Sequence, residues 1–234
     1  MNALRLAIIG DGKMGRLVAA LAAEEGVEVR AMLGKEIVTA LGITAEVLNG
    51  ASVAIEFTEP AAAAANVRAC LKAGCPVVCG TTGWDAERAT VEAEVRARGG
   101  ALLWAPNFSL GVHLFMRLVA EAARLARSAG GFDAHLVETH HAGKRDAPSG
   151  TARLLADAAE AASGSPVPIT SVRFGSVPGT HELFLDGAFE QLRLVHEARD
   201  RRVFALGAIT AARWIAGRRG VFTLDDMLAS ERGA

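Results

Sequence analysis

The chain has 234 residues, of which 51% are apolar and 22% charged, and its formal net charge is −1. This composition is typical of a globular protein with one large core or two small ones, and it provides no basic field for a nucleic-acid backbone. No apolar run reaches the roughly 18 residues of a membrane span. The start, from Met1 to Arg5, lacks the layout of a signal peptide, so we expect a cytoplasmic protein.

The first half of the chain alternates between strand and helix patterns. Strands are predicted at residues 4–9, 27–33, 53–57, 76–79 and 101–105, and helices at 16–25, 60–73 and 85–98. Such alternation indicates a parallel sheet covered by helices on both faces. Cys70, Cys75 and Cys79 are odd in number and match no common zinc spacing, so we interpret them as small buried hydrophobes with reduced thiols.

The pattern changes after residue 108. Helices are predicted at 111–129 and 151–162, and strands at 133–138, 169–174, 180–185 and 189–196, the last three without helices between them. In the first of these helices Leu114, Leu118 and Leu125 share one stripe. Helices at 202–215 and 223–228 complete the chain. The sequence therefore predicts an α/β protein, with an N-terminal Rossmann-like parallel sheet followed by an α+β domain with an antiparallel or mixed sheet.

A glycine motif joins the first strand to the first helix. The run Gly10-Asp11-Gly12-Lys13-Met14-Gly15 is a G-x-G-x-x-G, in which glycines allow a tight turn, close approach of a pyrophosphate, and helix–strand packing. This position favours a dinucleotide site, and the alternative is an ordinary glycine turn.

The second strand ends at Gly34 and Lys35. A carboxylate at this point would bind the ribose 2′-hydroxyl of NAD, whereas Lys35 could meet the 2′-phosphate of NADPH. We therefore favour NADPH, with NADH through Glu36 and a solvated Lys35 as alternatives. Two later loops also follow strands and could line a nicotinamide, or could be simple turns; they are Gly80-Thr81-Thr82-Gly83 and Ala105-Pro106-Asn107-Phe108.

The densest polar cluster spans residues 138–151 and contains His140, His141 and Lys144. It ends in Ser149-Gly150-Thr151 at a predicted helix start, where unpaired amides favour a carboxylate. A lysine adds positive charge and a histidine can supply a proton near neutral pH. Adjacent histidines on a strand point to opposite faces, which disfavours a shared metal. A solvated structural loop is the alternative.

These motifs, with Ile55-Glu56-Phe57-Thr58 and Phe204-Ala205-Leu206-Gly207-Ala208, resemble the dihydrodipicolinate reductase family over nearly the whole chain. The resemblance implies NAD(P)H-dependent reduction of dihydrodipicolinate in lysine and diaminopimelate synthesis. It implies a dinucleotide-binding domain at 1–108 and 214–234, and a substrate-binding and oligomerisation domain at 109–213 that builds a homotetramer. His140 would be the proton donor and Lys144 would hold a substrate carboxylate and assist catalysis; the other substrate-binding positions would be His141, Ser149, Gly150 and Thr151.

The sequence departs from the family pattern in three places. The glycine loop is one residue short, Gly34-Lys35 replaces the usual acidic residue, and the stretch at 34–49 is trimmed. Two rival functions share the glycine loop: another two-domain Rossmann dehydrogenase and a non-catalytic nucleotide sensor. Neither needs His140 together with Lys144.

Overall fold

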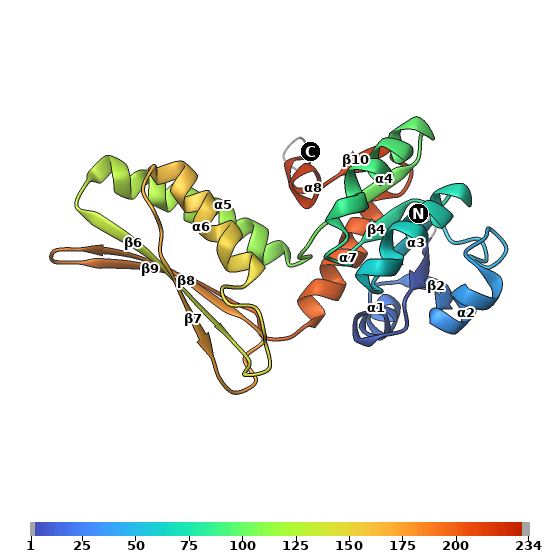
Figure 1. Ribbon diagram of the computed structural model, residues 1–234, viewed down its shortest axis with the longest axis horizontal. Coiled ribbons are helices and arrows are strands. Elements are labelled where there is room, and N and C mark those ends of the chain that lie inside the picture. The colour runs from blue at the N-terminus through green and yellow to red at the C-terminus, as the bar shows by residue number, and fades with distance from the viewer. Residues whose placement is uncertain (1–2, 231–234) are drawn as a thin grey trace. The chain divides into compact units, whose positions relative to one another are not determined.

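The computed structural model describes residues 3–230 and divides into two compact units (Figure 1). One unit runs to Phe108 and resumes at Arg202, and the other spans Ser109–Arg201. Met1 and Asn2, on which the expectation of a cytoplasmic location partly rests, lie outside the described residues. The same holds for residues 231–234, the end of the segment expected at 214–234.

The first unit contains a six-stranded, entirely parallel sheet with the strand order β10-β5-β4-β3-β1-β2. Its strands are β1 (Leu4–Ile9), β2 (Val27–Leu33), β3 (Val53–Glu56), β4 (Val77–Cys79), β5 (Ala101–Trp104) and β10 (Gly220–Phe222). The predicted parallel sheet is confirmed. The edge strand β10 has only three residues, too few to show a strand pattern in the sequence.

Helices cover both faces of this sheet. They are α1 (Lys13–Glu24), α2 (Lys35–Leu41), α3 (Pro60–Lys72), α4 (Asp85–Ala97), α7 (Arg202–Ile215) and α8 (Leu224–Ser230). Helices α1 and α7 pack together on one face, and α3 and α4 pack together on the other. Helix α2 was not predicted, because it is only seven residues long and none of them is fully buried. No helix within residues 3–230 has the length and apolar character needed to cross a membrane.

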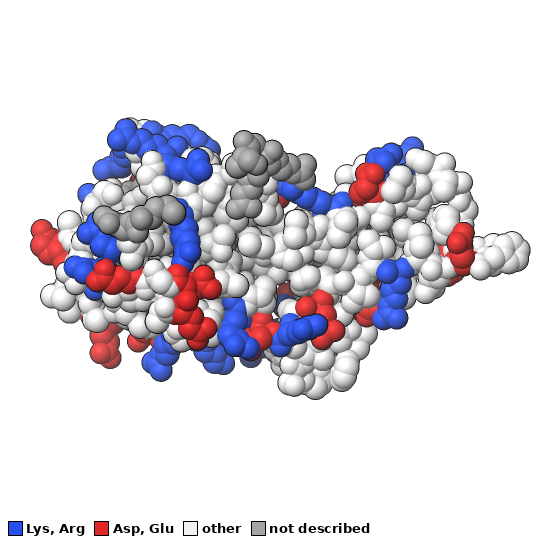
Figure 2. All heavy atoms as spheres, turned by 180° about the vertical axis from the view of Figure 1, so that it is seen from behind, with Lys and Arg blue, Asp and Glu red and all other residues white. Residues whose placement is uncertain are grey.

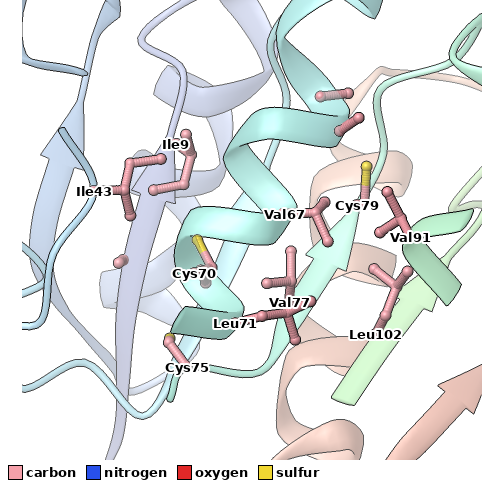
Figure 3. Packing of buried hydrophobic residues seen from close by; sticks show 14 of the residues in the cluster. Ile9, Ile43, Val67, Cys70, Leu71, Cys75, Val77, Cys79, Val91 and Leu102 are labelled. Atoms are coloured by element: carbon pink, nitrogen blue, oxygen red, sulfur yellow. The ribbon is translucent and has the colours of Figure 1, made fainter. Parts of the chain in front are cut away.

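The core beneath α3 and α4 is built from small and branched side chains (Figure 3). Val67 of α3 and Val91 of α4 meet Val77 and Leu102 of the sheet there. The three cysteines belong to the same cluster, which confirms their interpretation as buried hydrophobes. Burial raises the pKa of the Cys75 thiol to about 12, so this thiol is unreactive at neutral pH.

The chain returns to the first unit at Arg202, earlier than the boundary at residue 214 that the family resemblance implies. Helix α7 is the reason, because its buried Ala205, Ala208 and Ala212 pack against α1 and strands β3 to β5. A methyl group at Gly207 would overlap the carbonyl oxygen of Phe108. Small residues thus let α7 approach the loop after β5. The apolar pattern of this helix predicts that it is buried, but does not indicate which of the two sheets the helix covers.

The second unit contains a four-stranded sheet with the order β7-β6-β8-β9. Its elements are α5 (Leu110–Ala129), β6 (Phe132–His140), α6 (Gly150–Ser163), β7 (Ile169–Arg173), β8 (Thr180–Gly187) and β9 (Gln191–Glu197). Strand β6 pairs parallel with β7, while the other pairs are antiparallel. The sheet is therefore mixed, and α5 and α6 lie side by side on one of its faces (Figure 1).

Helix α5 turns a different stripe to this sheet from the leucine stripe visible in the sequence. Leu114, Leu118 and Leu125 are each more than half exposed, whereas Phe115 and Val119 are buried. The buried residues recur at the same helical spacing as the leucines. Periodicity therefore predicts the helix and leaves open which of two apolar stripes faces the core.

Charged side chains of both signs are interspersed over the face of the molecule seen in Figure 2. Neither sign covers the whole of this face.

We expect Gly207→Ala to lower the free energy of unfolding of the first unit by about 1–3 kcal/mol, because the added methyl must displace the backbone of Phe108. Chemical denaturation of the purified protein measures this change. The control is Gly12→Ala, since a methyl at Gly12 meets nothing within 4 Å. Equal stability of the two variants would contradict the close approach of α7.

Candidate active site

The loops that follow five parallel strands meet at one edge of the first sheet. Backbone hydrogen bonds of the sheet extend into these loops. Gly10 N donates to Leu33 O at 2.8 Å, and Gly80 N donates to Glu56 O at 2.9 Å. The chain passes from β1 outward to β2 and then returns to β3 on the other side of β1. Parallel sheets bind nucleotides at such a switch point.

The glycine motif leaves both space and unpaired amides at this edge. Gly10 has φ +104°, and methyl groups at Gly10 and Gly15 would overlap the carbonyl oxygens of Phe57 and Gly10. Gly12 is the N-cap of α1 and provides no side-chain cap. Lys13 and Met14 begin the helix. A bare helix N-terminus beside open space fits a pyrophosphate, so these residues fit a dinucleotide cofactor.

The end of β2 carries Gly34, which is buried, and Lys35, which is the first residue of α2 and not part of a loop. The side chain of Lys35 is 84% exposed, and its Nζ lies 3.5 Å from Glu59 Oε1. The lysine is thus available at the correct strand end, in an exposed ion pair of small energetic value.

The two later loops are fixed mainly by buried groups. The Thr58 amide donates to Thr81 Oγ1 at 2.8 Å, and the indole nitrogens of Trp84 and Trp104 both donate to the carbonyl of Thr81. Phe108 is buried and packs edge-on against Phe57. The side chains of Thr81, Ala105 and Phe108 are buried, Asn107 is half-buried, and Thr82 and Pro106 are exposed.

A buried carboxyl group, which the sequence interpretation left without a role, lies beneath this edge. Glu56 is fully buried and hydrogen-bonds with the hydroxyl of Thr58. Asn66 Nδ2 donates to Glu56 Oε1 at 3.3 Å, and Cys79 Sγ donates to Oε2 at 3.2 Å. Glu56 therefore ties β3, β4 and α3 together under the loops.

In the second unit, His140 ends β6 and is only 8% exposed. Its Nδ1 hydrogen-bonds with the carboxylate of Glu138, which is fully buried. Arg173 Nη2 and Nη1 donate to the two oxygens of Glu138 at 2.6 and 3.0 Å, and the Ser149 amide donates at 3.2 Å. Nδ1 is thus occupied by Glu138, so Nε2 is the ring nitrogen of His140 that Glu138 does not engage.

Opposing effects set the ionisation of this pair. Burial acts to raise the pKa of Glu138, but hydrogen bonds from Arg173, Ser171, His140 and Ser149 outweigh it and lower the pKa to about 2. Burial lowers the pKa of His140, and the charge of Glu138 only partly offsets this effect. Glu138 is therefore ionised at neutral pH, and it stabilises a proton on His140 against the cost of burial.

Ser149 links this pair to the start of α6. Its hydroxyl caps the helix by accepting from the Ala152 amide at 3.1 Å, and it lies 3.4 Å from His181 Nε2. Gly150 and Thr151 form the first turn, with open space around the Cα of Gly150. The helix start is therefore open to an anion beside the buried histidines.

His181 is a buried residue that sequence reasoning did not single out. Its ring packs edge-on against His140 at 5.3 Å between centroids, because strand register pairs Glu138 with His181. Arg173, also not singled out, pairs with His140 through β7. Neither residue lies in a local motif, so no sequence signal at its own position points to the site.

Lys144 lies in the loop between β6 and α6. Its Nζ is 2.8 Å from Asp146 Oδ1, and its amide donates to the carbonyl of His141 at 3.1 Å. The positive charges of Lys144 and Arg173 act on the pKa of His140, so all three belong to one electrostatic cluster. Among residues 3–230, no group of three or more His, Cys, Asp or Glu side chains could hold a metal ion.

Comparison with known proteins covers nearly the whole chain. Residues 4–108 match the family model for the N-terminus of dihydrodipicolinate reductase, and residues 111–228 match that for its C-terminus. The 4-hydroxy-tetrahydrodipicolinate reductase of Thiobacillus denitrificans is 36% identical over 266 residues, which cover 96% of this chain and 98% of the relative. The enzyme of that name from Archaeoglobus fulgidus is 36% identical over 260 residues, covering 96% and 100%.

Among solved structures, a dipicolinate-bound dihydrodipicolinate reductase from Paenisporosarcina sp. TG-14 has a TM-score of 0.78. It is 22% identical in sequence, and the match covers 95% of this chain and 98% of the other. This likeness supports the fold.

We expect the stability of the second unit to fall as the pH is lowered from 6.5 to 4. Burial lowers the pKa of His181 to about 4, so over this window the unfolded chain binds a proton that the folded chain excludes. The loss between pH 7 and pH 4.5 should be about 2 kcal/mol. Denaturation at a series of pH values measures it.

His181→Asn should reduce this pH dependence, whatever its effect on stability at pH 7; the remaining slope comes from other histidines, whose pKa values burial also lowers. His135→Gln, on the other face of the same sheet, is the matched control and should retain the slope. An unchanged slope in His181→Asn would show that the histidine is not the group responsible.

Proposed function

Because this chain belongs to the dihydrodipicolinate reductase family and carries out the reduction for which that family is named, we propose how its residues perform the reaction. The substrate is a dicarboxylate, and the product serves lysine and diaminopimelate biosynthesis. We infer that His140 protonates the substrate, and that Lys144 and the start of α6 bind its carboxylates.

The observation that carries this proposal is the buried His140–Glu138–Arg173 cluster, joined through Ser149 to an open helix start. The cluster would supply a proton donor, fixed in orientation, beside groups suited to carboxylates. His141 and Lys144 follow His140 in the loop between β6 and α6, and Gly150 and Thr151 begin α6. A dehydrogenase for another substrate class, or a nucleotide sensor, has no need of this combination.

Loss of water from 4-hydroxy-tetrahydrodipicolinate gives dihydrodipicolinate, and the reduced nicotinamide, when bound, supplies the hydride that would convert ring C4 of this compound on the way to tetrahydrodipicolinate. The second half of the reaction requires one proton, and His140 would deliver it from Nε2. Glu138 would hold the His140 imidazole in the required orientation and tautomer through its hydrogen bond with Nδ1. Lys144 would exchange its exposed contact with Asp146 for a substrate carboxylate, which costs little because such surface pairs are weak.

We propose NADPH as the favoured cofactor, with NADH as the alternative. Gly10, Gly12 and Gly15 would give the pyrophosphate access to the amides of α1, next to Asp11, Lys13 and Met14. Lys35 would meet the 2′-phosphate beside Gly34. The loops Gly80-Thr81-Thr82 and Ala105-Pro106-Asn107-Phe108 would border the nicotinamide.

We also propose a homotetramer in the cytoplasm. The mixed sheet supports the assembly, since α5 and α6 cover only one of its faces. Within residues 3–230, no helix of the second unit lies on the face that carries Val137, Phe184 and Val195. The reduced state of the three cysteines fits the location.

The proposal is tested by mixing the protein with NADPH or NADH and freshly prepared 4-hydroxy-tetrahydrodipicolinate, and following the loss of reduced-nicotinamide absorbance. We expect rapid, substrate-dependent oxidation. His140→Ala should lower turnover by about 10²–10⁴-fold, the usual contribution of a general acid, with the cofactor Kd unchanged. His135→Gln, on the same strand, is the control and should retain turnover. An equal loss of turnover and cofactor affinity in His140→Ala would contradict the role as proton donor.

Lys35→Ala should weaken NADPH binding about tenfold or more and leave NADH binding nearly unchanged, because only NADPH carries the 2′-phosphate that the lysine would neutralise. Titration of each cofactor, followed by its fluorescence, gives both Kd values. Unchanged affinities for both would remove Lys35 from the cofactor site.

A further inference from the structure

At the end of β2, a glycine stands where many dinucleotide-binding folds have an acidic residue. Strand β2 ends at Leu33, whose carbonyl accepts from the Gly10 amide at 2.8 Å. The next residue is Gly34, at the position where a Rossmann fold places the carboxylate that reads the adenosine ribose. The glycine loop and the end of β2 are therefore in direct contact.

The backbone of Gly34 does not require glycine. Its φ is −74° and its ψ is 171°, an extended conformation that any residue adopts. A Cβ added there would instead lie 2.8 Å from both Cγ and Oδ2 of Asp11, and 3.0 Å from Oδ1. Gly34 is thus small because the Asp11 carboxylate occupies the space of its missing side chain.

The Asp11 carboxylate is also available for a ligand. Asp11 is exposed, and its only described hydrogen bond uses its backbone carbonyl, which accepts from Arg16 Nε at 2.7 Å. No described residue donates to the carboxylate itself. Glu36, another acidic residue near this strand end, lies in the first turn of α2 and is exposed, and it is not among the atoms nearest to a Cβ at Gly34.

We propose that Asp11 is the ribose-reading residue of this enzyme: its carboxylate replaces, from the glycine loop, the acidic side chain missing at Gly34. It would accept a hydrogen bond from the 2′-hydroxyl of NADH and repel the 2′-phosphate of NADPH. Lys35 would act in the opposite direction, so the two residues together set the cofactor ratio. This inference rests on the proposed nicotinamide site and does not depend on the identity of the substrate.

The test measures the Kd of NADH and of NADPH in the absence of substrate, by fluorescence titration. Asp11→Ala should weaken NADH binding by about tenfold, the loss expected for a hydrogen bond to a charged group, and should leave NADPH binding equal or tighter. Asp11→Asn keeps the side-chain shape and should tighten NADPH by removing the repulsion. Glu36→Gln is the matched control and should leave both Kd values at the wild-type level.

A rescue variant makes the test specific. In Asp11→Ala/Gly34→Asp the carboxylate moves to the end of β2, and NADH affinity should return to within about threefold of wild type. Gly34→Asp alone places two carboxylates in one space and should bind NADH less tightly than the double variant.

Two outcomes would overturn the inference. Parallel changes in NADH and NADPH affinity in Asp11→Ala would show only a distorted glycine loop, and unchanged affinities would show that Asp11 does not touch the ribose. Failure of the wild-type protein to bind either cofactor would overturn the nicotinamide site as well. Normal binding without reduction of dihydrodipicolinate would instead count against the proposed reaction and leave the role of Asp11 standing.

Discussion

The carboxylate of Glu138 is fully buried, and the arrangement of the loop between β6 and α6 depends on the groups that neutralise it. Arg173 comes from β7, His140 from the end of β6, and the Ser149 amide from the start of α6. A buried charge without a partner costs several kcal/mol, so folding brings these three segments to one point. The same interactions orient His140 and leave the helix start open to an anion, so stability and the proposed chemistry share one cluster.

In the first unit, small residues and not buried charges bring distant segments of the chain together. Gly10 and Gly15 bring strand, loop and helix backbones into contact, and Gly207 brings α7 against the loop after β5. Such contacts leave no room for side chains at the sheet edge and expose amides at the start of α1. Glu56 and Thr81, both buried, then hold the neighbouring loops in place through hydrogen bonds.

At the proposed cofactor edge of this sheet, few charged side chains are available for recognition. Asp11 and Lys35 are both exposed and come from neighbouring loop and helix ends, with opposite signs. A balance of two such groups can be shifted by a single substitution, whereas the buried cluster of the second unit cannot change without a loss of stability. Under the proposed function, the cofactor preference is therefore the part that single substitutions can change, and the cluster around Glu138 is the part that the fold holds fixed.

The sequence by itself determined the parallel sheet, the mixed sheet, most helix ends, and the loops that carry His140, Lys144 and the glycine motif. These features follow from local periodicity and from residues adjacent in the chain. Only the tertiary structure decided which stripe of α5 is buried, that α7 belongs to the first unit, and that Arg173 and His181 join His140. It also decided that Asp11 fills the space beside Gly34. In each case the physical reason is the same: strand register and helix packing bring together residues distant in sequence, and no local pattern encodes those partners.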